Sequence, residues 1–345
     1  MHGRRREALK EPTVDEKEQN RQRVEKYCAL NSSVMDLRSK SVFSTDALNQ
    51  TRRLLELNTE LHTVWNYRRQ VFMQLDIWQD PEERQRVLEE ELRFLMEIIM
   101  KNIKSYWMWN HRVWALSSLP RPEWQRELKL VAKLLAVDAR NYHGWDYRRF
   151  VVARLKETVV DERVVDEQEF AFTTEQIKRD CANHSAWHNR SKLLPAVLSS
   201  TSEAAQASML EEETKLILNA IYTDPDDQNA WLYYEWLVSM QPSDTSRLIL
   251  LRNKVTAIRE LLELEEDSKR PLIELVIALT AIDCMRPELV TNSEKQECLE
   301  TLSVLQCIDA YRVGRYSDMN RILAQRWGLA ANSSTTKPGL AVVEP

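Results

Sequence analysis

The sequence predicts an all-α protein, a right-handed superhelical crescent of antiparallel helix pairs. Its main signal is a Trp that recurs at intervals of 44, 36, 42 and 44 residues, a regularity typical of stacked repeats. The five positions are Trp65, Trp109, Trp145, Trp187 and Trp231. Before the Trp, apolar residues recur every three or four positions, as in "ELRFLMEIIM" and "ELKLVAKLLA", which indicates helices with one apolar face. Because one pair cannot bury that face alone, successive pairs are expected to stack.

Each copy predicts a helix, a short polar turn and a second helix, in that order. The first helix ends at an Asn or Asp seven residues before the Trp, since these residues favour turns and helix ends. These turn residues are Asn58, Asn102, Asp138, Asp180 and Asp224. The second helix begins near the Trp, whose large ring is expected to be buried against the partner helix. Three residues further on, on the same helix face, four copies carry Arg and the fifth carries Tyr234.

The repeats predict a single helical-repeat domain over residues 1–331. Residues 1–19 form a basic stretch that is expected to be a flexible arm, and residues 20–43 are expected to be helical. The five clear copies occupy residues 50–245. A solenoid of this length can remain one unit because each repeat contacts only its neighbours.

Three stretches depart from the regular copies. Residues 195–209 are rich in Ser and Ala and are expected to be a loop inserted between the fourth and fifth copies. A degenerate sixth copy spans residues 295–325, in which Asp309 stands seven residues before Tyr316, the residue at the Trp position. Residues 332–345 lack periodicity and are expected to be disordered.

Composition excludes several classes of function. Only 5 of the 345 residues are Gly, and no Gly-rich loop of the kind that binds nucleotide phosphates is present, which argues against ATPases, kinases and dehydrogenases. The net charge of −5 gives no support to nucleic-acid binding. No apolar run reaches the length of a membrane span, and no secretory signal is recognisable, so we expect a cytoplasmic protein that is not integral to a membrane. The five Cys, an odd number without paired spacing, fit reduced thiols.

One segment, "CANHSAWH", carries three potential metal ligands, Cys181, His184 and His188. Two His four residues apart on a helix can bind zinc. However, His184 and His188 occupy places that other copies fill with Tyr, Asn or Asp, and no fourth ligand is nearby. We therefore expect no metal site in this chain.

Polar residues gather in the turn before the second helix of copies two and three. These are Lys104, Tyr106, Asn141, Tyr142 and His143. Because stacking brings equivalent positions side by side, they are expected to share one rim near helix N-termini, where hydrogen-bond donors suit an anion such as a phosphate. A solvated rim of ordinary turn residues is the alternative.

The copies resemble the repeat of protein prenyltransferase alpha subunits, whose core is Asn-Tyr, two residues, then Trp and Arg. The segments that carry the resemblance are "LHTVWNYRR", "KSYWMWNHR", "NYHGWDYRR", "NHSAWHNR" and "DQNAWLYY". It covers residues 50–325. The start "MHGR" and the segments "RNYHGWDYRRFV" and "DPDDQNAW" resemble Rab geranylgeranyltransferase more than the subunit shared by farnesyltransferase and type I geranylgeranyltransferase. Two copies depart from the pattern. The fifth has Tyr234 in place of the Arg, and the sixth has neither the Trp nor the Arg.

This resemblance implies the alpha subunit of a heterodimeric enzyme, active only with a beta subunit that holds the zinc and most of the lipid pocket. The implied reaction transfers geranylgeranyl from geranylgeranyl diphosphate to C-terminal cysteines of Rab GTPases, which the Rab escort protein presents. The resemblance places Lys104 at the diphosphate, with Tyr106, Asn141, Tyr142 and His143 beside it. His2 is expected to reach the beta-subunit zinc when substrate is absent. The alternatives are the subunit shared by farnesyltransferase and type I geranylgeranyltransferase, and a helical scaffold without catalytic function.

Overall fold

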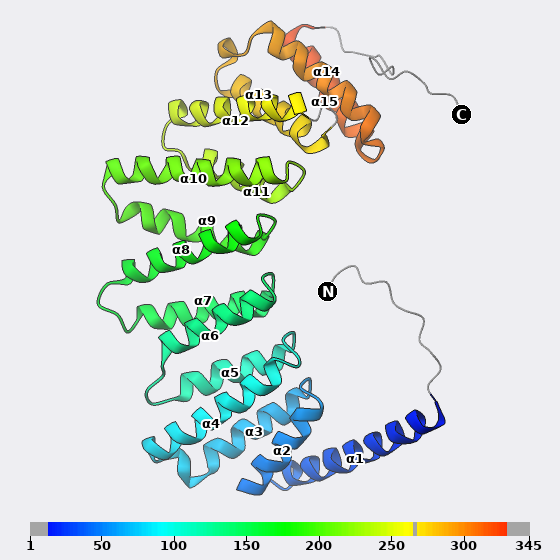
Figure 1. Ribbon diagram of the computed structural model, residues 1–345, viewed down its shortest axis with the longest axis vertical. Coiled ribbons are helices and arrows are strands. Elements are labelled where there is room, and N and C mark those ends of the chain that lie inside the picture. Colours follow the sequence, from blue (N-terminus) through cyan, green and yellow to red (C-terminus); the bar gives the residue numbers. More distant parts are fainter. Residues whose placement is uncertain (1–12, 265–267, 330–345) are drawn as a thin grey trace. The chain divides into compact units, whose positions relative to one another are not determined.

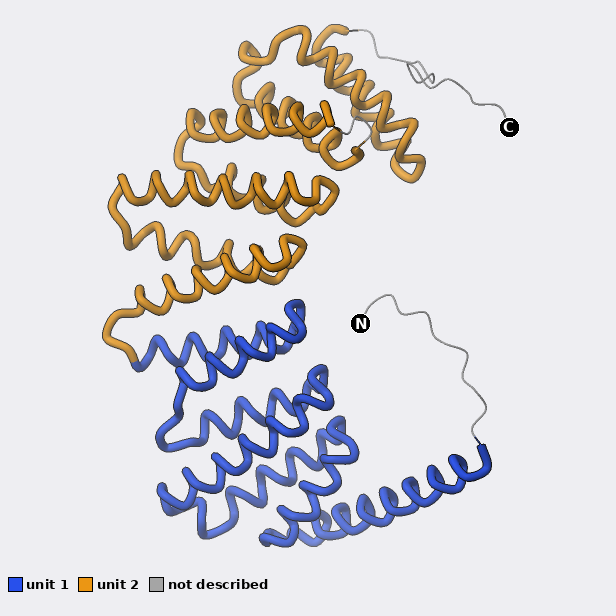
Figure 2. The backbone as a smooth tube through the Cα atoms, in the orientation of Figure 1, with its two compact units in different colours: residues 1–158 blue, residues 159–345 orange. Residues whose placement is uncertain are grey.

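The computed structural model describes residues 13–264 and 268–329, which form helices and, within these ranges, no β-strand. The all-α prediction is confirmed. The chain divides into two compact units, residues 1–158 and 159–345, which are described separately (Figure 2). A single domain over residues 1–331 stays a prediction.

Unit 1 consists of one long helix followed by three helix pairs (Figure 1). Its elements are α1 (Val14–Ser39), α2 (Thr45–Leu57), α3 (His62–Gln74), the 3-10 turn η1 (Asp76–Trp78), α4 (Pro81–Ile99), α5 (Tyr106–Ser118), α6 (Trp124–Val137) and α7 (Tyr142–Lys156). Within each pair, α2 packs on α3, α4 on α5 and α6 on α7. The second helices also contact one another in sequence, α3 with α5 and α5 with α7.

Unit 2 contains four further pairs (Figure 1). Its elements are α8 (Glu162–Arg179), α9 (His184–Ser199), α10 (Glu203–Thr223), α11 (Gln228–Met240), α12 (Asp244–Leu264), α13 (Lys269–Met285), the 3-10 turns η2 (Pro287–Leu289) and η3 (Ala310–Arg312), α14 (Asn292–Ile308) and α15 (Val313–Trp327). The pair formed by α14 and α15 lies where the sixth copy was predicted.

Two local predictions are wrong. The flexible arm does not extend to residue 19, because α1 begins at Val14 behind a capping box in which Thr13 and Glu16 satisfy each other's backbone N–H groups. The loop predicted at residues 195–209 is helical except for residues 200–202, which separate α9 from α10. The Ala and Glu residues of this stretch favour helix, and Pro195 is accommodated inside α9. Residues 332–345 lie outside the described residues.

The five repeated Trp side chains anchor the turn of each pair. Every one is at most 4% exposed and is the fourth residue of its helix. Each indole Nε1 donates a hydrogen bond to the carbonyl oxygen six residues earlier, at 2.7 or 2.8 Å. In the sixth copy, Tyr316 takes the same place and donates its hydroxyl to Asp309 at 2.9 Å. The ring thus fills the core, as the sequence predicted, and the structure adds that its polar atom satisfies the turn.

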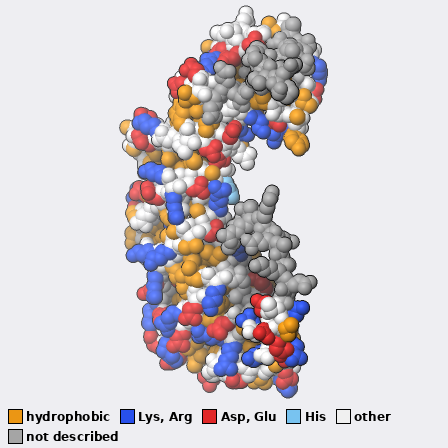
Figure 3. All heavy atoms as spheres, turned by 45° about the vertical axis from the view of Figure 1, so that its right-hand side comes forward, with side chains coloured by type: hydrophobic (Ala, Val, Ile, Leu, Met, Phe, Trp, Pro, Cys, Tyr) orange, Lys and Arg blue, Asp and Glu red, His pale blue; other side chains and the backbone are white. Residues whose placement is uncertain are grey.

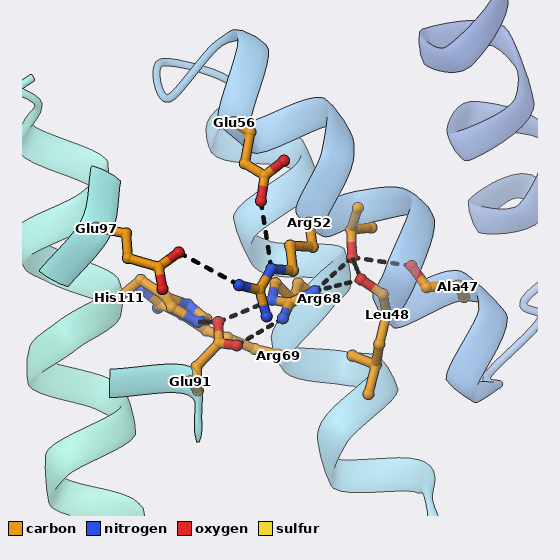
Figure 4. A network of polar contacts seen from close by, with 10 residues as sticks. Ala47, Leu48, Arg52, Glu56, Arg68, Arg69, Glu91, Glu97 and His111 are labelled. Carbon is orange, nitrogen blue, oxygen red and sulfur yellow. Dashed lines mark hydrogen bonds and ion pairs between the residues drawn. The ribbon is translucent and has the colours of Figure 1, made fainter. Parts of the chain in front are cut away.

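The repeated Arg joins one pair to the next. Arg68 of α3 donates to the Leu48 carbonyl of α2 and forms two hydrogen bonds with Glu91 of α4, and His111 of α5 completes the network (Figure 4). Equivalent networks join Arg112, Glu127 and Tyr147, and join Arg190, Glu213 and Tyr233. The Arg is therefore architectural.

Burial and the charge of Arg68 together set the protonation states of Glu91 and His111. Burial acts to raise the pKa of Glu91, but the charge and hydrogen bonds of Arg68 outweigh it and lower that pKa to about 2. Burial lowers the pKa of His111 to about 4, against the effect of its bond to Glu91. Arg69 Nε donates to His111 Nδ1 at 3.1 Å, so Nε2 carries the proton of the neutral imidazole and donates it to Glu91.

Candidate functional site

The predicted site residues lie at the N-terminal ends of α5 and α7, two neighbouring helices of unit 1. We call this region the α5–α7 rim, comprising Lys104, Tyr106, Asn141, Tyr142 and His143. Tyr106 and Tyr142 are the first residues of their helices and are 56% and 69% exposed. Lys104 is exposed in the turn that precedes α5. Three of the polar side chains are thus available to a ligand.

Tyr106 and His143 meet across the gap between the two helices. Their ring centroids are 5.5 Å apart, with the ring planes at 74°, an edge-to-face contact. Both residues line a groove of about 230 Å³ between α5 and α7, which Asn110 and Asp146 also border. The structure therefore brings together side chains from copies two and three, as the repeat argument predicted.

The two helix ends differ in how their backbone N–H groups are satisfied. At α7, Asn141 accepts a hydrogen bond from Gly144 N at 2.9 Å and donates to Asp138 at 3.2 Å. Asn141 is only 4% exposed, so it positions the turn. At α5, the preceding Ser105 makes no capping bond and directs its hydroxyl toward the Thr59 carbonyl. The first turn of α5 therefore has N–H groups without a side-chain cap, next to Lys104, which favours an anion there.

Two further aromatic side chains beside the α5–α7 rim, His62 and Trp107, were not predicted from the sequence. His62 begins α3, and its ring lies 5.1 Å from that of Trp107, the second residue of α5. Trp107 in turn contacts Tyr106 at 5.7 Å, so aromatic rings continue along the rim from α3 to α7. The repeat spacing could have predicted the position of His62. It stands three residues before its Trp, where Tyr106 and Tyr142 stand in later copies.

Other parts of the described chain present neither a metal cluster nor a membrane span. No group of three or more His, Cys, Asp or Glu in residues 13–264 and 268–329 is arranged to hold a metal ion. Within the same ranges, no helix is both long and apolar enough to cross a bilayer. On the face shown in Figure 3, basic and acidic side chains are interspersed with hydrophobic ones. His2 lies outside the described residues.

Comparison with known proteins identifies the repeat. The protein prenyltransferase alpha subunit repeat matches residues 44–75, 88–119, 124–155, 166–197 and 210–241, and each match ends ten residues beyond one of the five Trp. The alpha subunit of geranylgeranyl transferase type-2 from Saccharomyces cerevisiae is 36% identical over 248 residues, covering 69% of this chain and 72% of that protein. The chain belongs to the protein prenyltransferase alpha-subunit family. The predicted family is thereby confirmed.

Within this family the similarity is to type-2 geranylgeranyl transferases, as the sequence segments predicted. The alpha subunit of the Bos taurus enzyme is 39% identical over 255 residues, which make up 72% of this chain and 44% of that protein. The chain thus spans less than half the length of this relative. A solved structure, Candida albicans protein geranylgeranyltransferase-I complexed with GGPP, matches 87% of this chain with a TM-score of 0.66 at 20% identity, which supports the prenyltransferase fold.

Proposed function

We propose that this prenyltransferase alpha subunit works in a type II geranylgeranyltransferase, transferring geranylgeranyl from its diphosphate to C-terminal cysteines of Rab GTPases. The observation that carries the proposal is the α5–α7 rim on a chain similar to type-2 alpha subunits. A helical scaffold needs only the buried Trp and Arg networks and gives no reason for exposed Lys104 and Tyr106 beside an uncapped helix end. A cytoplasmic heterodimer with a beta subunit, supplied with Rab by the Rab escort protein, belongs to the same proposal.

The rim's part in the reaction is electrostatic. The thiolate sulfur of the substrate Cys forms a bond to C1 of the lipid while the C1–O bond breaks, and the diphosphate leaves with the negative charge. Zinc held by the beta subunit would bind the sulfur of the substrate Cys and lower the pKa of its thiol, which favours the thiolate. The ammonium of Lys104 stabilises the charge that grows on the leaving oxygen, and this effect is greatest in the transition state. Tyr106 and His143, in contact with each other, orient the diphosphate by hydrogen bonds.

Replacing Lys104 tests this role. Lys104→Ala should slow single-turnover prenylation roughly ten- to a thousandfold while lipid binding weakens less. The matched control is Lys101→Ala, an exposed Lys of the same turn, which should leave the rate unchanged. A Lys104→Ala heterodimer with the wild-type rate would show that the rim is a solvated surface and that catalysis rests with the partner subunit.

The assay also separates the alternative functions. The chain is co-expressed with a type-2 beta subunit and tested with a Rab plus its escort protein, and separately with a short peptide ending in a CaaX sequence. Transfer to Rab supports the proposal. In a parallel co-expression with the beta subunit of a CaaX enzyme, transfer to the peptide without transfer to Rab in the first arm assigns the chain to the CaaX enzymes. A chain that binds no beta subunit is a scaffold, and the proposed function fails.

A further inference from the structure

Arg69 of α3 binds neutral groups on α5 instead of an acidic side chain. Its Nε donates to His111 Nδ1 at 3.1 Å, beside the Arg68 network (Figure 4). Its Nη2 donates to Asn110 Oδ1 at 2.6 Å. Arg69 makes no ion pair within residues 13–264 and 268–329. The position of its guanidinium is therefore set by α5, and the bond to Asn110 ties it to the helix that carries Tyr106.

This bond fixes the orientation of the Asn110 amide. A guanidinium has only donors, so it meets the amide oxygen and not the amide nitrogen. The two N–H donors of Asn110 Nδ2 are consequently turned away from Arg69, and no described residue accepts a hydrogen bond from them. Asn110 is exposed and lines the groove of about 230 Å³ between α5 and α7. Arg69 thus holds two unused donors at this groove.

The groove continues from the α5–α7 rim along one face of each helix, and we call it the α5–α7 groove. A polar residue follows Tyr106 by four positions and another follows His143 by three, and one turn further each helix presents an apolar side chain. The polar residues are Asn110 and Asp146, and the apolar ones are Val113 and Phe150. A ligand here therefore meets the rim first, then an amide and a carboxylate, and then an apolar end.

The two polar walls match a peptide backbone better than a phosphate. Asn110 offers donors on α5, whereas Asp146 on α7 offers acceptor oxygens, one of which pairs with Arg149 at 3.0 Å. A diphosphate has no donor for the Asp146 carboxylate and is repelled by it. An extended peptide presents both a C=O acceptor and an N–H donor at every residue, and its alternating side chains allow one to enter the apolar end.

The neighbouring rim identifies which peptide this is. In the proposed reaction, the sulfur of the substrate Cys reaches C1 of the lipid while Lys104, Tyr106 and His143 hold the diphosphate. The chain that carries this Cys therefore passes close to the rim, where the α5–α7 groove begins. The acceptor segment next to the Cys is thus the peptide that this reaction brings to the groove.

We propose that Asn110 binds the backbone of the prenyl acceptor next to its reactive Cys, and that Arg69 is the positioning residue that orients the Asn110 amide for this contact. This inference rests on the proposed function, because it takes the acceptor from there. Asn110 Nδ2 donates to a carbonyl oxygen of the acceptor, and Asp146 accepts from one of its N–H groups. The groove thus sets the affinity for the acceptor, while Lys104 acts on the chemical step.

Asn110→Asp tests the contact without removing the bond to Arg69. The new carboxylate still accepts from Arg69 but offers no donor to the acceptor's carbonyl. In the assembled enzyme, the KM for a Rab bound to its escort protein should rise roughly five- to fiftyfold. This rise should exceed any fall in the rate at saturating acceptor, and the Kd for geranylgeranyl diphosphate should stay at the wild-type value. The matched control is Asn66→Asp, the same change at the equivalent exposed position of α3, outside the groove, which should leave the KM unchanged.

A double-mutant cycle tests the positioning role of Arg69. Arg69→Met removes the donor that orients Asn110 and should also raise the KM for the acceptor. Combining it with Asn110→Asp should raise the KM no further than the stronger single variant does, because Arg69 acts through Asn110. Multiplicative increases would refute the positioning role. Asn110→Asp keeps the bond to Arg69, so it tests the contact even if Arg69→Met fails to fold.

A photo-crosslinking amino acid in place of Val113 identifies the occupant of the groove directly. With the heterodimer, lipid, Rab and escort protein mixed, mass spectrometry should find a crosslink to the Rab segment next to the C-terminal Cys. A crosslink to the beta subunit alone, an unchanged KM in Asn110→Asp, an equal rise in Asn66→Asp, or weaker lipid binding in place of a raised KM would overturn the inference while the proposed function stands. If the wild-type heterodimer transfers no lipid to Rab, both fail.

Discussion

Removing Glu127 should expose how strongly the buried networks hold neighbouring pairs together. Arg112 is 1% exposed and donates to the two Glu127 carboxylate oxygens at 2.7 to 3.1 Å, and Tyr147 donates to the same carboxylate at 2.8 Å. Glu127→Leu leaves a buried guanidinium without its counter-ion, which costs about 3–5 kcal/mol. Since a whole domain is stable by only about 5–15 kcal/mol, this single change should remove a large part of the stability.

The companion variant separates loss of a partner from loss of the network. Arg112→Met/Glu127→Leu/Tyr147→Phe replaces all three polar groups with apolar ones of similar size, so it should lie within about 1–2 kcal/mol of the wild type. Free energies of unfolding come from urea titrations followed by circular dichroism. If Glu127→Leu costs less than about 1 kcal/mol, or the triple variant is as unstable as the single one, then the carboxylate is not the counter-ion that this reasoning requires.

Further predictions concern His111 and the aromatic hydrogen bonds. Because the folded-state pKa of His111 is lowered from 6.5 to about 4, its contribution to stability is present above pH 6.5 and is lost as the pH falls toward 4. His111→Gln should reduce this loss by on the order of 3 kcal/mol in urea titrations across that window, and equal losses would contradict it. Trp187→Phe leaves the Cys181 carbonyl without its donor and should cost about 1–3 kcal/mol. Tyr316→Phe should cost only about 0.5–1.5 kcal/mol, because Asp309 keeps its pair with Arg312. If either variant melted at the wild-type temperature, the hydrogen bond that it lacks would not anchor the turn.

The repeat spacing was enough to predict the helix pairs of the five regular copies and the pair of α14 and α15. It also placed Tyr106 and His143 on one rim, because stacked repeats position equivalent residues as neighbours. It could not show that Asn141 is a buried cap while Tyr142 is exposed, because the spacing places both residues at the turn and does not give the exposure of either. The sequence also did not show that Glu91 is the counter-ion of Arg68. A Glu among many on an amphipathic helix is usually solvated, and only the burial of Arg68 beside it distinguishes this one.

The pair of α12 and α13 was missed because Leu272 and Leu275 stand at the positions that Trp and Arg occupy in the regular copies. Leu272 takes the Trp position, 41 residues after Trp231 and 44 before Tyr316, so the interval alone would have found it. In the regular networks, an acidic residue on the first helix bonds to His or Tyr 20 residues later, as Glu213 does to Tyr233.

In the pair of α12 and α13, Lys254 stands at the position that the acidic residue occupies in the regular networks. Its ammonium donates to Glu274, 20 residues later, at 2.6 Å. The polarity of the network is therefore inverted. An Arg from the fifth copy would meet this buried ammonium as a like charge, a costly arrangement in the interior. Tyr234 stands there instead, with its ring centroid 5.8 Å from Lys254 Nζ, where an aromatic face attracts a cation. The departure of the fifth copy from the family pattern thus follows from the inverted charge in the next pair.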